Sequence, residues 1–298
     1  MNAIARTKVL LIGAYGRVGL VLAPILEMSG YKVLYQGRGA SAQTRFDPTS
    51  ITQLIAVLDK NSPDIIVNLA ALTSVDECQK SPILAYEANT RIVETIAAAI
   101  QISGRSIHLI QISTDHLYDG EGLSNEEDIR PINMYAITKY AGELSARTVG
   151  ATILRTNYIG RCANITQGQS ISDWIVNSLI AKKVITLFED VMFSPLHIKT
   201  LCVLVTSLLK IRTAGTYNLG SIGGISKADF GIKLASGLNL DLRCLRIGKL
   251  SDANLESKRP LNMMMNCEKF MNQFKLDLPN IDQEISLLIN DYKFNKKN

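Results

Sequence analysis

The sequence lacks the residue patterns that mark disulfide-rich and metal-binding proteins. Its five cysteines, Cys78, Cys162, Cys202, Cys244 and Cys267, form no Cys-x-x-Cys pair, and their odd number argues against a closed disulfide framework. Reduced thiols are typical of a cytoplasmic protein, which is the compartment that we predict. The three histidines show no metal-ligand spacing, so we expect no metal site.

Long hydrophobic runs and strong net charge are also missing. The longest apolar run, Leu201–Val205, is far too short to span a bilayer, so we expect no membrane association. The first residues lead directly into a strand pattern, and we expect no signal peptide. The net charge of +5 is modest, and its one cluster is the tail Lys293–Lys297. This charge distribution contains no basic patch of the kind that binds nucleic acid.

The sequence does contain a regular alternation of strand-like and helix-like segments in its first half. Its 298 residues, 47% of them hydrophobic, suffice for a large core. The strand patterns fall at Lys8–Gly13, Lys32–Gln36, Asp64–Asn68, His108–Ile112 and Ala151–Arg155. Strands that alternate with helices predict an α/β fold with a doubly wound parallel (Rossmann) sheet covered on both faces. Ligands bind at the carboxyl ends of such strands.

The second half is less regular. Helical patterns cover Ser172–Lys182, Lys199–Ile211 and Lys227–Gly237, and Gly215–Leu219 has the character of a strand that rejoins the sheet. We therefore expect a dinucleotide-binding domain over residues 1–156, with a return of the chain around residues 197–219. Residues 157–298 are expected to form mainly a smaller, partly interleaved substrate-binding lobe.

A glycine-rich turn, Gly13-x-x-Gly16-x-x-Gly19, joins the first strand pattern to an apolar helical pattern. Glycines in this context let the backbone approach a pyrophosphate at a helix N-terminus, although a tight turn with positive φ would also select them. The second strand ends without a carboxylate and is followed by Arg38, whose planar fork suits a 2′-phosphate. We therefore predict NADPH as cofactor, with NADH as the alternative and a solvated Arg38 as the simpler interpretation.

A tyrosine and a lysine stand four residues apart in Tyr135-Ala-Ile-Thr-Lys139, a spacing that places both on one helix face. The ammonium lowers the pKa of the phenol toward neutrality, as a proton donor to a developing alkoxide requires. Alone, this spacing is common on solvated helices. Upstream, Ser113 and Thr114 follow a strand pattern, where their hydroxyls could donate to a substrate carbonyl or simply satisfy turn backbone groups.

Several sequence motifs, in their order and residues, resemble those of the extended short-chain dehydrogenase/reductases, and within them the dTDP-4-dehydrorhamnose reductase group. Besides the glycine turn, they are Asn68-Leu-Ala-Ala71, Val75-Asp-Glu-Cys78, Ser113-Thr-Asp115, Tyr135-Ala-Ile-Thr-Lys139-Tyr-Ala-Gly-Glu143 and Leu154-Arg-Thr156. The resemblance implies reduction of the 4-keto group of a nucleoside-diphosphate 4-keto-6-deoxy sugar. It implies that Tyr135 is the acid, that Lys139 lowers its pKa and holds the nicotinamide ribose, and that Thr114 hydrogen-bonds the keto oxygen.

The same resemblance implies binding residues and an assembly. The implied cofactor contacts, besides Tyr135 and Lys139, are Gly13, Tyr15, Gly16, Arg17, Val18, Gly19, Arg38, Asp47 near the adenine, Ala70 and Ala71. The implied substrate contacts are Thr73, Val75, Asp115 and Asn157. Relatives commonly pair through the helix that carries Tyr135, which suggests a homodimer.

One departure and two alternatives stay open. Asn157-Tyr158 stands where the rhamnose enzymes have a Ser-Trp pair, so a different sugar is plausible and the nucleotide is undetermined. An epimerase or dehydratase of the same fold recycles its cofactor, and Asp115 beside Thr114 is compatible with that chemistry. A non-catalytic, NADP-binding regulatory subunit is the third class, although it has no need for Thr114, Tyr135 and Lys139 together.

Overall fold

The computed structural model describes residues 6–39, 42–162 and 169–294, and the chain forms two compact units. Unit 1 consists of Met1–Thr114, Asn133–Arg155 and Cys202–Tyr217. Unit 2 consists of Asp115–Ile132, Thr156–Leu201 and Asn218–Asn298. Each unit is therefore assembled from three segments that are separate in the sequence.

A seven-stranded sheet forms the centre of unit 1, with the strand order β11-β6-β5-β4-β1-β2-β3. Its strands are β1 (Lys8–Ile12), β2 (Lys32–Gly37), β3 (Thr44–Arg45), β4 (Ile65–Asn68), β5 (His108–Thr114), β6 (Thr152–Thr156) and β11 (Gly215–Leu219). β1 pairs in parallel with both β2 and β4, and β4 pairs in parallel with β5. The predicted doubly wound parallel sheet is confirmed.

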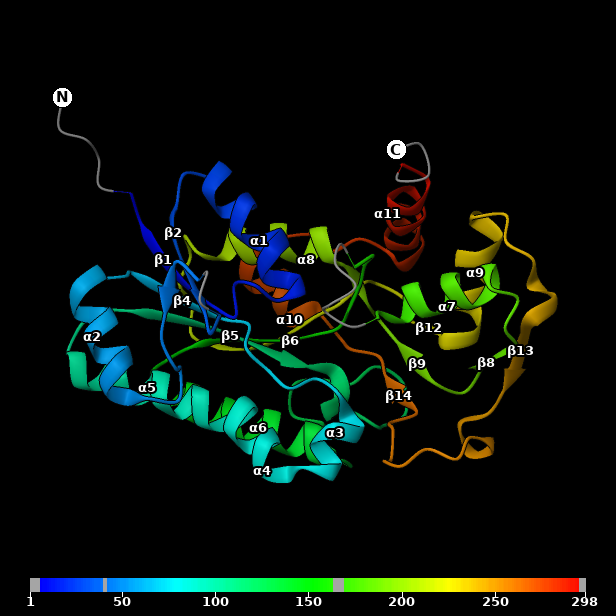
Figure 1. Cartoon of the computed structure of the whole chain (residues 1–298), viewed down its shortest axis with the longest axis horizontal. Helices are drawn as coiled ribbons and strands as arrows, with labels where there is room; N and C mark the ends of the chain where they lie inside the picture. The colour runs from blue at the N-terminus through cyan, green and yellow to red at the C-terminus, as the bar shows by residue number, and fades with distance from the viewer. Residues whose placement is uncertain (1–5, 40–41, 163–168, 295–298) are drawn as a thin grey trace. The chain divides into compact units, whose positions relative to one another are not determined.

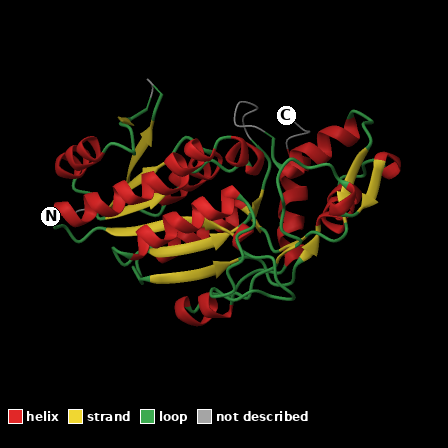
Figure 2. Cartoon of the chain, turned by 90° about the horizontal axis from the view of Figure 1, so that it is seen from below, coloured by secondary structure: helices red, strands yellow, loops and turns green. Residues whose placement is uncertain are grey.

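Helices cover both faces of this sheet. They are α1 (Arg17–Met28), α2 (Ile51–Asn61), α3 (Val75–Lys80), α4 (Pro82–Tyr86), η1 (Glu87–Arg91), α5 (Ile92–Ser103), α6 (Met134–Arg147) and α8 (Ile198–Leu208). α2, α5 and α6 lie on one face, and α1 lies on the other beside α8, where the Cys202 thiol approaches the Val18 carbonyl at 3.8 Å (Figure 1). Figure 2 shows helices, in red, that run alongside the strands of the large sheet, in yellow. Buried side chains such as Leu10, Leu54 and Ile96 fill the core between sheet and helices.

The helical segment from Pro82 to Ser103 is divided, because a π-helical turn, η1, separates α4 from α5. The turn contains the buried Asn89, whose amide oxygen accepts a hydrogen bond from the Leu72 N–H at 2.8 Å. Its amide nitrogen donates to the Thr138 hydroxyl at 3.1 Å. Asn89 thus joins the loop after β4 to α6, in keeping with the frequent placement of π-helical turns at functional sites.

Unit 2 contains small sheets of two or three short strands. Its strands are β7 (Tyr158–Ile159), β8 (Ile185–Phe188), β9 (Met192–Phe193), β10 (Leu196–His197), β12 (Ile225–Ser226), β13 (Leu245–Gly248) and β14 (Asn262–Met263), paired as β10-β7, β12-β9-β14 and β13-β8. Its helices are η2 (Asp115–Leu117), α7 (Ile171–Ile180), α9 (Lys227–Gly237), η4 (Leu242–Cys244), η5 (Leu250–Asp252), α10 (Glu268–Phe274) and α11 (Ile281–Phe294). Ile175, Phe193, Phe230 and Leu288 belong to a separate hydrophobic core.

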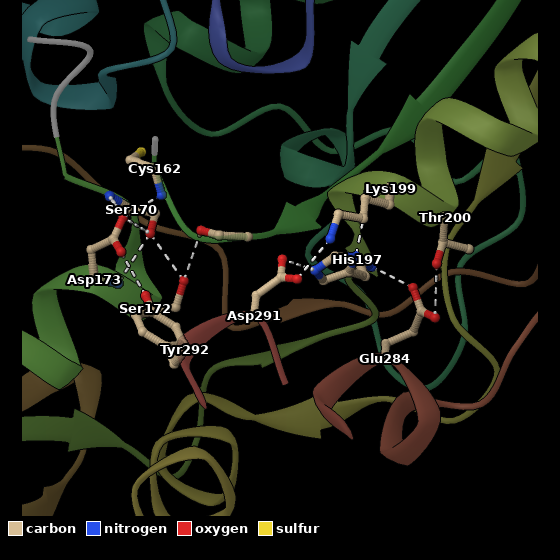
Figure 3. A network of polar contacts seen from close by, with 11 residues as sticks. Cys162, Ser170, Ser172, Asp173, His197, Lys199, Thr200, Glu284, Asp291 and Tyr292 are labelled. Atoms are coloured by element: carbon tan, nitrogen blue, oxygen red, sulfur yellow. Dashed lines mark hydrogen bonds and ion pairs between the residues drawn. The ribbon is translucent and has the colours of Figure 1, made fainter. Parts of the chain in front are cut away.

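Polar contacts fix α11 to the segment that runs from β10 into α8 (Figure 3). The His197 backbone N–H and the Thr200 hydroxyl both donate to the Glu284 carboxylate. The His197 ring lies 3.1 Å from Asp291, which also accepts a 2.7 Å hydrogen bond from Lys199. His197 is therefore a buried residue that anchors the C-terminal helix.

Candidate functional site

The glycine turn between β1 and α1 is shaped by close backbone contacts. Gly13 has φ +80°, and a Cβ there would lie 2.9 Å from the Ala70 nitrogen. Gly16 precedes α1 and donates its N–H to the Gly13 carbonyl at 3.0 Å. A Cβ at Gly19 would lie 2.6 Å from the Ala14 carbonyl carbon, so this glycine lets α1 pack against the turn. The turn therefore keeps the N-terminus of α1 close to the ends of β1 and β4.

A cavity of about 570 Å³ lies over the ends of β1, β2 and β4. Seven of the residues predicted to contact the cofactor line it: Gly13, Tyr15, Gly16, Arg38, Asp47, Ala70 and Ala71. Arg17 and Val18 instead form the first turn of α1, and Gly19 is buried beneath the glycine turn. The sequence did not reveal further lining residues, among them Gln36, Thr49, Glu77 and Glu87.

Gln36 is the most informative of these additional residues. It is buried in β2, and its side-chain oxygen accepts a hydrogen bond from the Gly13 N–H at 3.0 Å. Its amide nitrogen donates to the Phe46 carbonyl at 2.9 Å. Gln36 thus fastens the glycine turn to the second strand. A polar residue within the apolar Lys32–Gln36 pattern was the available signal.

The far wall of the cavity carries one cation and one carboxylate. Arg38 is exposed directly after β2 and forms no ion pair with the residues that the structure describes. Asp47 accepts hydrogen bonds from the Thr49 N–H at 3.0 Å and the Thr49 hydroxyl at 2.8 Å, so its carboxylate is engaged in its own turn. The guanidinium is therefore available to an anionic ligand group.

Tyr135 and Lys139 lie on the buried face of α6, which begins after Asn133 caps the Ala136 N–H at 2.9 Å. Lys139 is 4% exposed, and its ammonium donates to the Ile112 carbonyl in β5 at 2.7 Å. Burial lowers the pKa of Lys139 to about 8, although the negative charge of Glu143 opposes the shift. The hydrogen bond holds this ammonium against the strand that ends at Thr114.

Ser113 and Thr114 were expected in a loop, but they are the last two residues of β5, and both are buried. The Ser113 hydroxyl donates to the Glu143 carboxylate at 2.5 Å. Glu143 also accepts from the Arg155 guanidinium at 2.9 and 2.7 Å, and both of these charged side chains are completely buried. Ser113 is thus part of a buried ion-pair network, and Thr114 follows it as the last residue of the strand.

The four expected substrate contacts have different surroundings. Asp115 is buried in unit 2 and accepts a hydrogen bond from the Asn157 amide at 2.6 Å. Thr73 is exposed in the loop after β4, in unit 1. Val75 is buried in a cluster that includes Tyr135. Asn157 therefore supports Asp115 at the position where the sequence departs from the rhamnose enzymes.

Within the described ranges, no three His, Cys, Asp or Glu side chains are grouped so that they could hold a metal ion. Among the helices of the described part of the chain, none is long and apolar enough to cross a membrane.

Comparison with known proteins gives a family for this arrangement. The model of the RmlD substrate binding domain matches residues 7–294. The chain belongs to the RmlD substrate binding domain family. Its relatives include the probable low-salt glycan biosynthesis reductase Agl14 of Haloferax volcanii, 26% identical over 93% of this chain and 95% of that protein.

Two further RmlD relatives carry the name dTDP-4-dehydrorhamnose reductase. The Escherichia coli protein is 26% identical over 95% of this chain and 97% of its own length. The Bacillus anthracis enzyme, solved in complex with NADP, has a TM-score of 0.85 and 24% identity over 96% of this chain and 100% of that one. The resemblance read from the sequence is thus confirmed at the level of the family and the fold.

Proposed function

We propose that this protein is an NADPH-dependent reductase of the 4-keto group of a nucleoside-diphosphate 4-keto-6-deoxy sugar. The reductase names of its RmlD relatives support this proposal. The observation that carries it is the Lys139 ammonium, held on the Ile112 carbonyl and on the same buried helix face as Tyr135. Thr114 ends the strand that Lys139 contacts.

The residues around the cavity of unit 1 fit a phosphorylated dinucleotide. Gly13 and Gly16 line the cavity without side chains of their own, so the N-terminus of α1 can receive a pyrophosphate. Arg38 would hold a 2′-phosphate with two parallel hydrogen bonds, because no carboxylate follows β2 to prefer the free ribose hydroxyls. Tyr15 and Asp47 would border the adenine side. The NADP complex of the Bacillus anthracis relative is consistent with this choice.

The reaction needs a hydride for the carbonyl carbon and a proton for its oxygen. Bound NADPH would supply the hydride. The Tyr135 hydroxyl donates the proton to the oxygen, and solvent then reprotonates the phenolate. Lys139 favours the ionised form of Tyr135 through its positive charge, and the Thr114 hydroxyl donates a hydrogen bond to the oxygen as negative charge develops. The product is a 4-hydroxy sugar nucleotide.

We assign cofactor binding mainly to residues 1–156 and substrate binding mainly to residues 157–298, with Thr73, Val75, Asp115 and Asn157 on the sugar side. We also infer a cytoplasmic enzyme that forms a homodimer. Exposed apolar side chains on α6, Ile137 and Leu144, support pairing through that helix. Sedimentation analysis of the wild type and of Leu144→Lys tests the dimer, which the lysine should dissociate.

Stoichiometry distinguishes the proposed reductase from its alternatives. A reductase should oxidise one NADPH for each molecule of a dTDP-4-keto-6-deoxyhexose consumed, as loss of absorbance at the nicotinamide band. Sugar turnover without net NADPH loss would indicate an epimerase or dehydratase. Binding of NADPH and sugar without any turnover would indicate a regulatory protein.

A further inference from the structure

The Ser113 hydroxyl takes no part in the mechanism proposed above, although it lies one residue before Thr114 in β5. Ser113 is 5% exposed, and its hydroxyl donates to Oε1 of Glu143 on α6 at 2.5 Å. The Glu143 side chain is completely buried. Hydrogen bonds to a carboxylate are short and strong, and burial keeps water from replacing either partner. The bond therefore fixes Ser113 to α6.

The carboxylate that Ser113 contacts is itself held in place by Arg155. The guanidinium donates from Nε to Oε1 of Glu143 at 2.9 Å and from Nη2 to Oε2 at 2.7 Å. A pair of parallel hydrogen bonds of this kind fixes the plane of a carboxylate. Arg155 belongs to β6, which is the neighbour of β5 in the sheet. The three side chains thus join β5, β6 and α6 within unit 1.

A second contact fixes the residue before Ser113. The Lys139 ammonium donates to the Ile112 carbonyl at 2.7 Å. Lys139 and Glu143 are four residues apart on α6, and Tyr135 precedes Lys139 by the same interval, so the three side chains share one buried face. Two consecutive residues of β5 are therefore bound to the helix face that carries Tyr135.

Thr114 directly follows these two anchored residues and ends β5. The Cα atoms of neighbouring residues are only about 3.8 Å apart, so an anchor on Ser113 restricts where the Thr114 hydroxyl can lie. This restriction matters for catalysis, because a displacement of about 1 Å in a reacting group can cost about 10²-fold in rate. The position of Thr114 relative to α6 thus depends on Ser113.

We propose that Ser113 is a positioning residue, whose hydrogen bond to Glu143 places the Thr114 hydroxyl correctly relative to Tyr135. This assignment rests on the proposed reduction of a keto sugar nucleotide, in which Thr114 and Tyr135 both act on the keto oxygen. Ser113 acts through Thr114 and not on the substrate. Its loss should therefore slow the reaction only while the Thr114 hydroxyl is present.

A double-mutant cycle tests this dependence. The proteins are the wild type, Ser113→Ala, Thr114→Val and the double variant. Thr152→Val, alone and combined with Thr114→Val, is the control. Thr152 is also buried in the central sheet, but it is the first residue of β6, and its hydroxyl donates to the Thr213 carbonyl. Thermal unfolding shows whether each variant is folded, and Ser113→Cys, with a weak donor of similar size, replaces Ser113→Ala if that variant unfolds.

Single-turnover NADPH oxidation with a dTDP-4-keto-6-deoxyhexose gives the hydride-transfer rate. Ser113→Ala should lower this rate about 10- to 100-fold and leave KM for NADPH nearly unchanged. In the Thr114→Val background, the same substitution should cost about threefold or less, because the hydroxyl that it misplaces is already gone. Thr152→Val should stay within about twofold of its parent in both backgrounds.

The Thr114 methyl group gives a second measurement that needs no activity. In cofactor-free protein with labelled threonine methyl groups, the NMR order parameter of the Thr114 methyl reports how firmly this side chain is held. The order parameter should fall in Ser113→Ala and stay at the wild-type value in Thr152→Val. A general loss of stability would lower it in neither variant or in both.

The outcomes separate the two proposals. A wild-type rate in Ser113→Ala, an undiminished cost of this substitution in the Thr114→Val background, or an unchanged Thr114 methyl would overturn the assignment of Ser113 even if NADPH is oxidised. Thr114→Val that reacts as the wild type does would overturn the roles of Thr114 and Ser113 but not the reductase. If the wild type oxidises no NADPH, the reductase is overturned, and the Thr114 methyl alone decides whether Ser113 positions this residue.

Discussion

The buried ion pair between Glu143 and Arg155 makes a quantitative prediction about stability. Glu143→Gln removes the negative charge but keeps a side chain of similar shape, so the guanidinium of Arg155 remains buried without its counter-charge. Breaking a fully buried pair in this way costs about 3–5 kcal/mol. For a domain of this size, each kcal/mol lowers the melting temperature by roughly 2–4 °C, so we expect a fall of roughly 6–20 °C.

Calorimetric unfolding with two comparison variants measures this effect. Replacing both partners, as Glu143→Met with Arg155→Met, removes both charges of this pair and should return stability to within about 2 kcal/mol of the wild type. The exposed pair between Arg105 and Asp59 provides the surface control, and Asp59→Asn should cost less than about 1 kcal/mol. If Glu143→Gln melted at the wild-type temperature, the assignment of Glu143 as the counter-charge of Arg155 would be wrong.

Three further predictions concern unit 1. Arg38→Ala should raise KM for NADPH about 10- to 100-fold and leave KM for NADH nearly unchanged in steady-state assays. An equal rise in KM for both cofactors would contradict a contact between Arg38 and the 2′-phosphate. Lys139→Met should abolish turnover yet stabilise the cofactor-free fold by about 3 kcal/mol at pH 7 in urea unfolding, because burial lowers the pKa of Lys139 from 10.5 to about 8. The free-energy cost of burying this charge is fully present below pH 8 and is lost as the pH rises toward 10.5. The free energies of unfolding of the wild type and of Lys139→Met should therefore converge near pH 10.5. Burial likewise lowers the pKa of His108 to about 4, and its Nε2 bonds the Thr152 hydroxyl at 2.8 Å. Stability should therefore fall as pH drops from 6.5 toward 4, and His108→Gln should lose less over that range.

Much of unit 1 could be predicted because local patterns and global topology agree there. The apolar strand patterns, the glycine turn and the expected strand Gly215–Leu219 all appear, and Gly215–Leu219 joins the sheet next to β6 as β11. The division of the helix at η1 was not predictable, since residues 87–91 carry no proline or glycine. That π-helical turn accompanies the tertiary hydrogen bonds of Asn89, which depend on residues distant in the sequence.

The candidate site also contains residues that the sequence predicts and residues that only the structure reveals. Motif spacing identified Thr114, Tyr135 and Lys139, because the chemistry constrains those side chains. Motif spacing did not show that Glu143, which belongs to the same sequence block as Tyr135 and Lys139, has a structural role. Glu143 forms a buried ion pair with Arg155.

The role of Tyr135 as the acid is the central claim, and single-turnover NADPH oxidation by Tyr135→Phe tests it most directly. Tyr140→Phe is the matched control, since Tyr140 lies on the same helix with its ring beside Arg147. With a dTDP-4-keto-6-deoxyhexose, Tyr135→Phe should retain cofactor binding and lose about 10²- to 10⁴-fold in the hydride-transfer rate, whereas Tyr140→Phe should react as the wild type does. A Tyr135→Phe enzyme that oxidises NADPH at the wild-type rate would contradict the account.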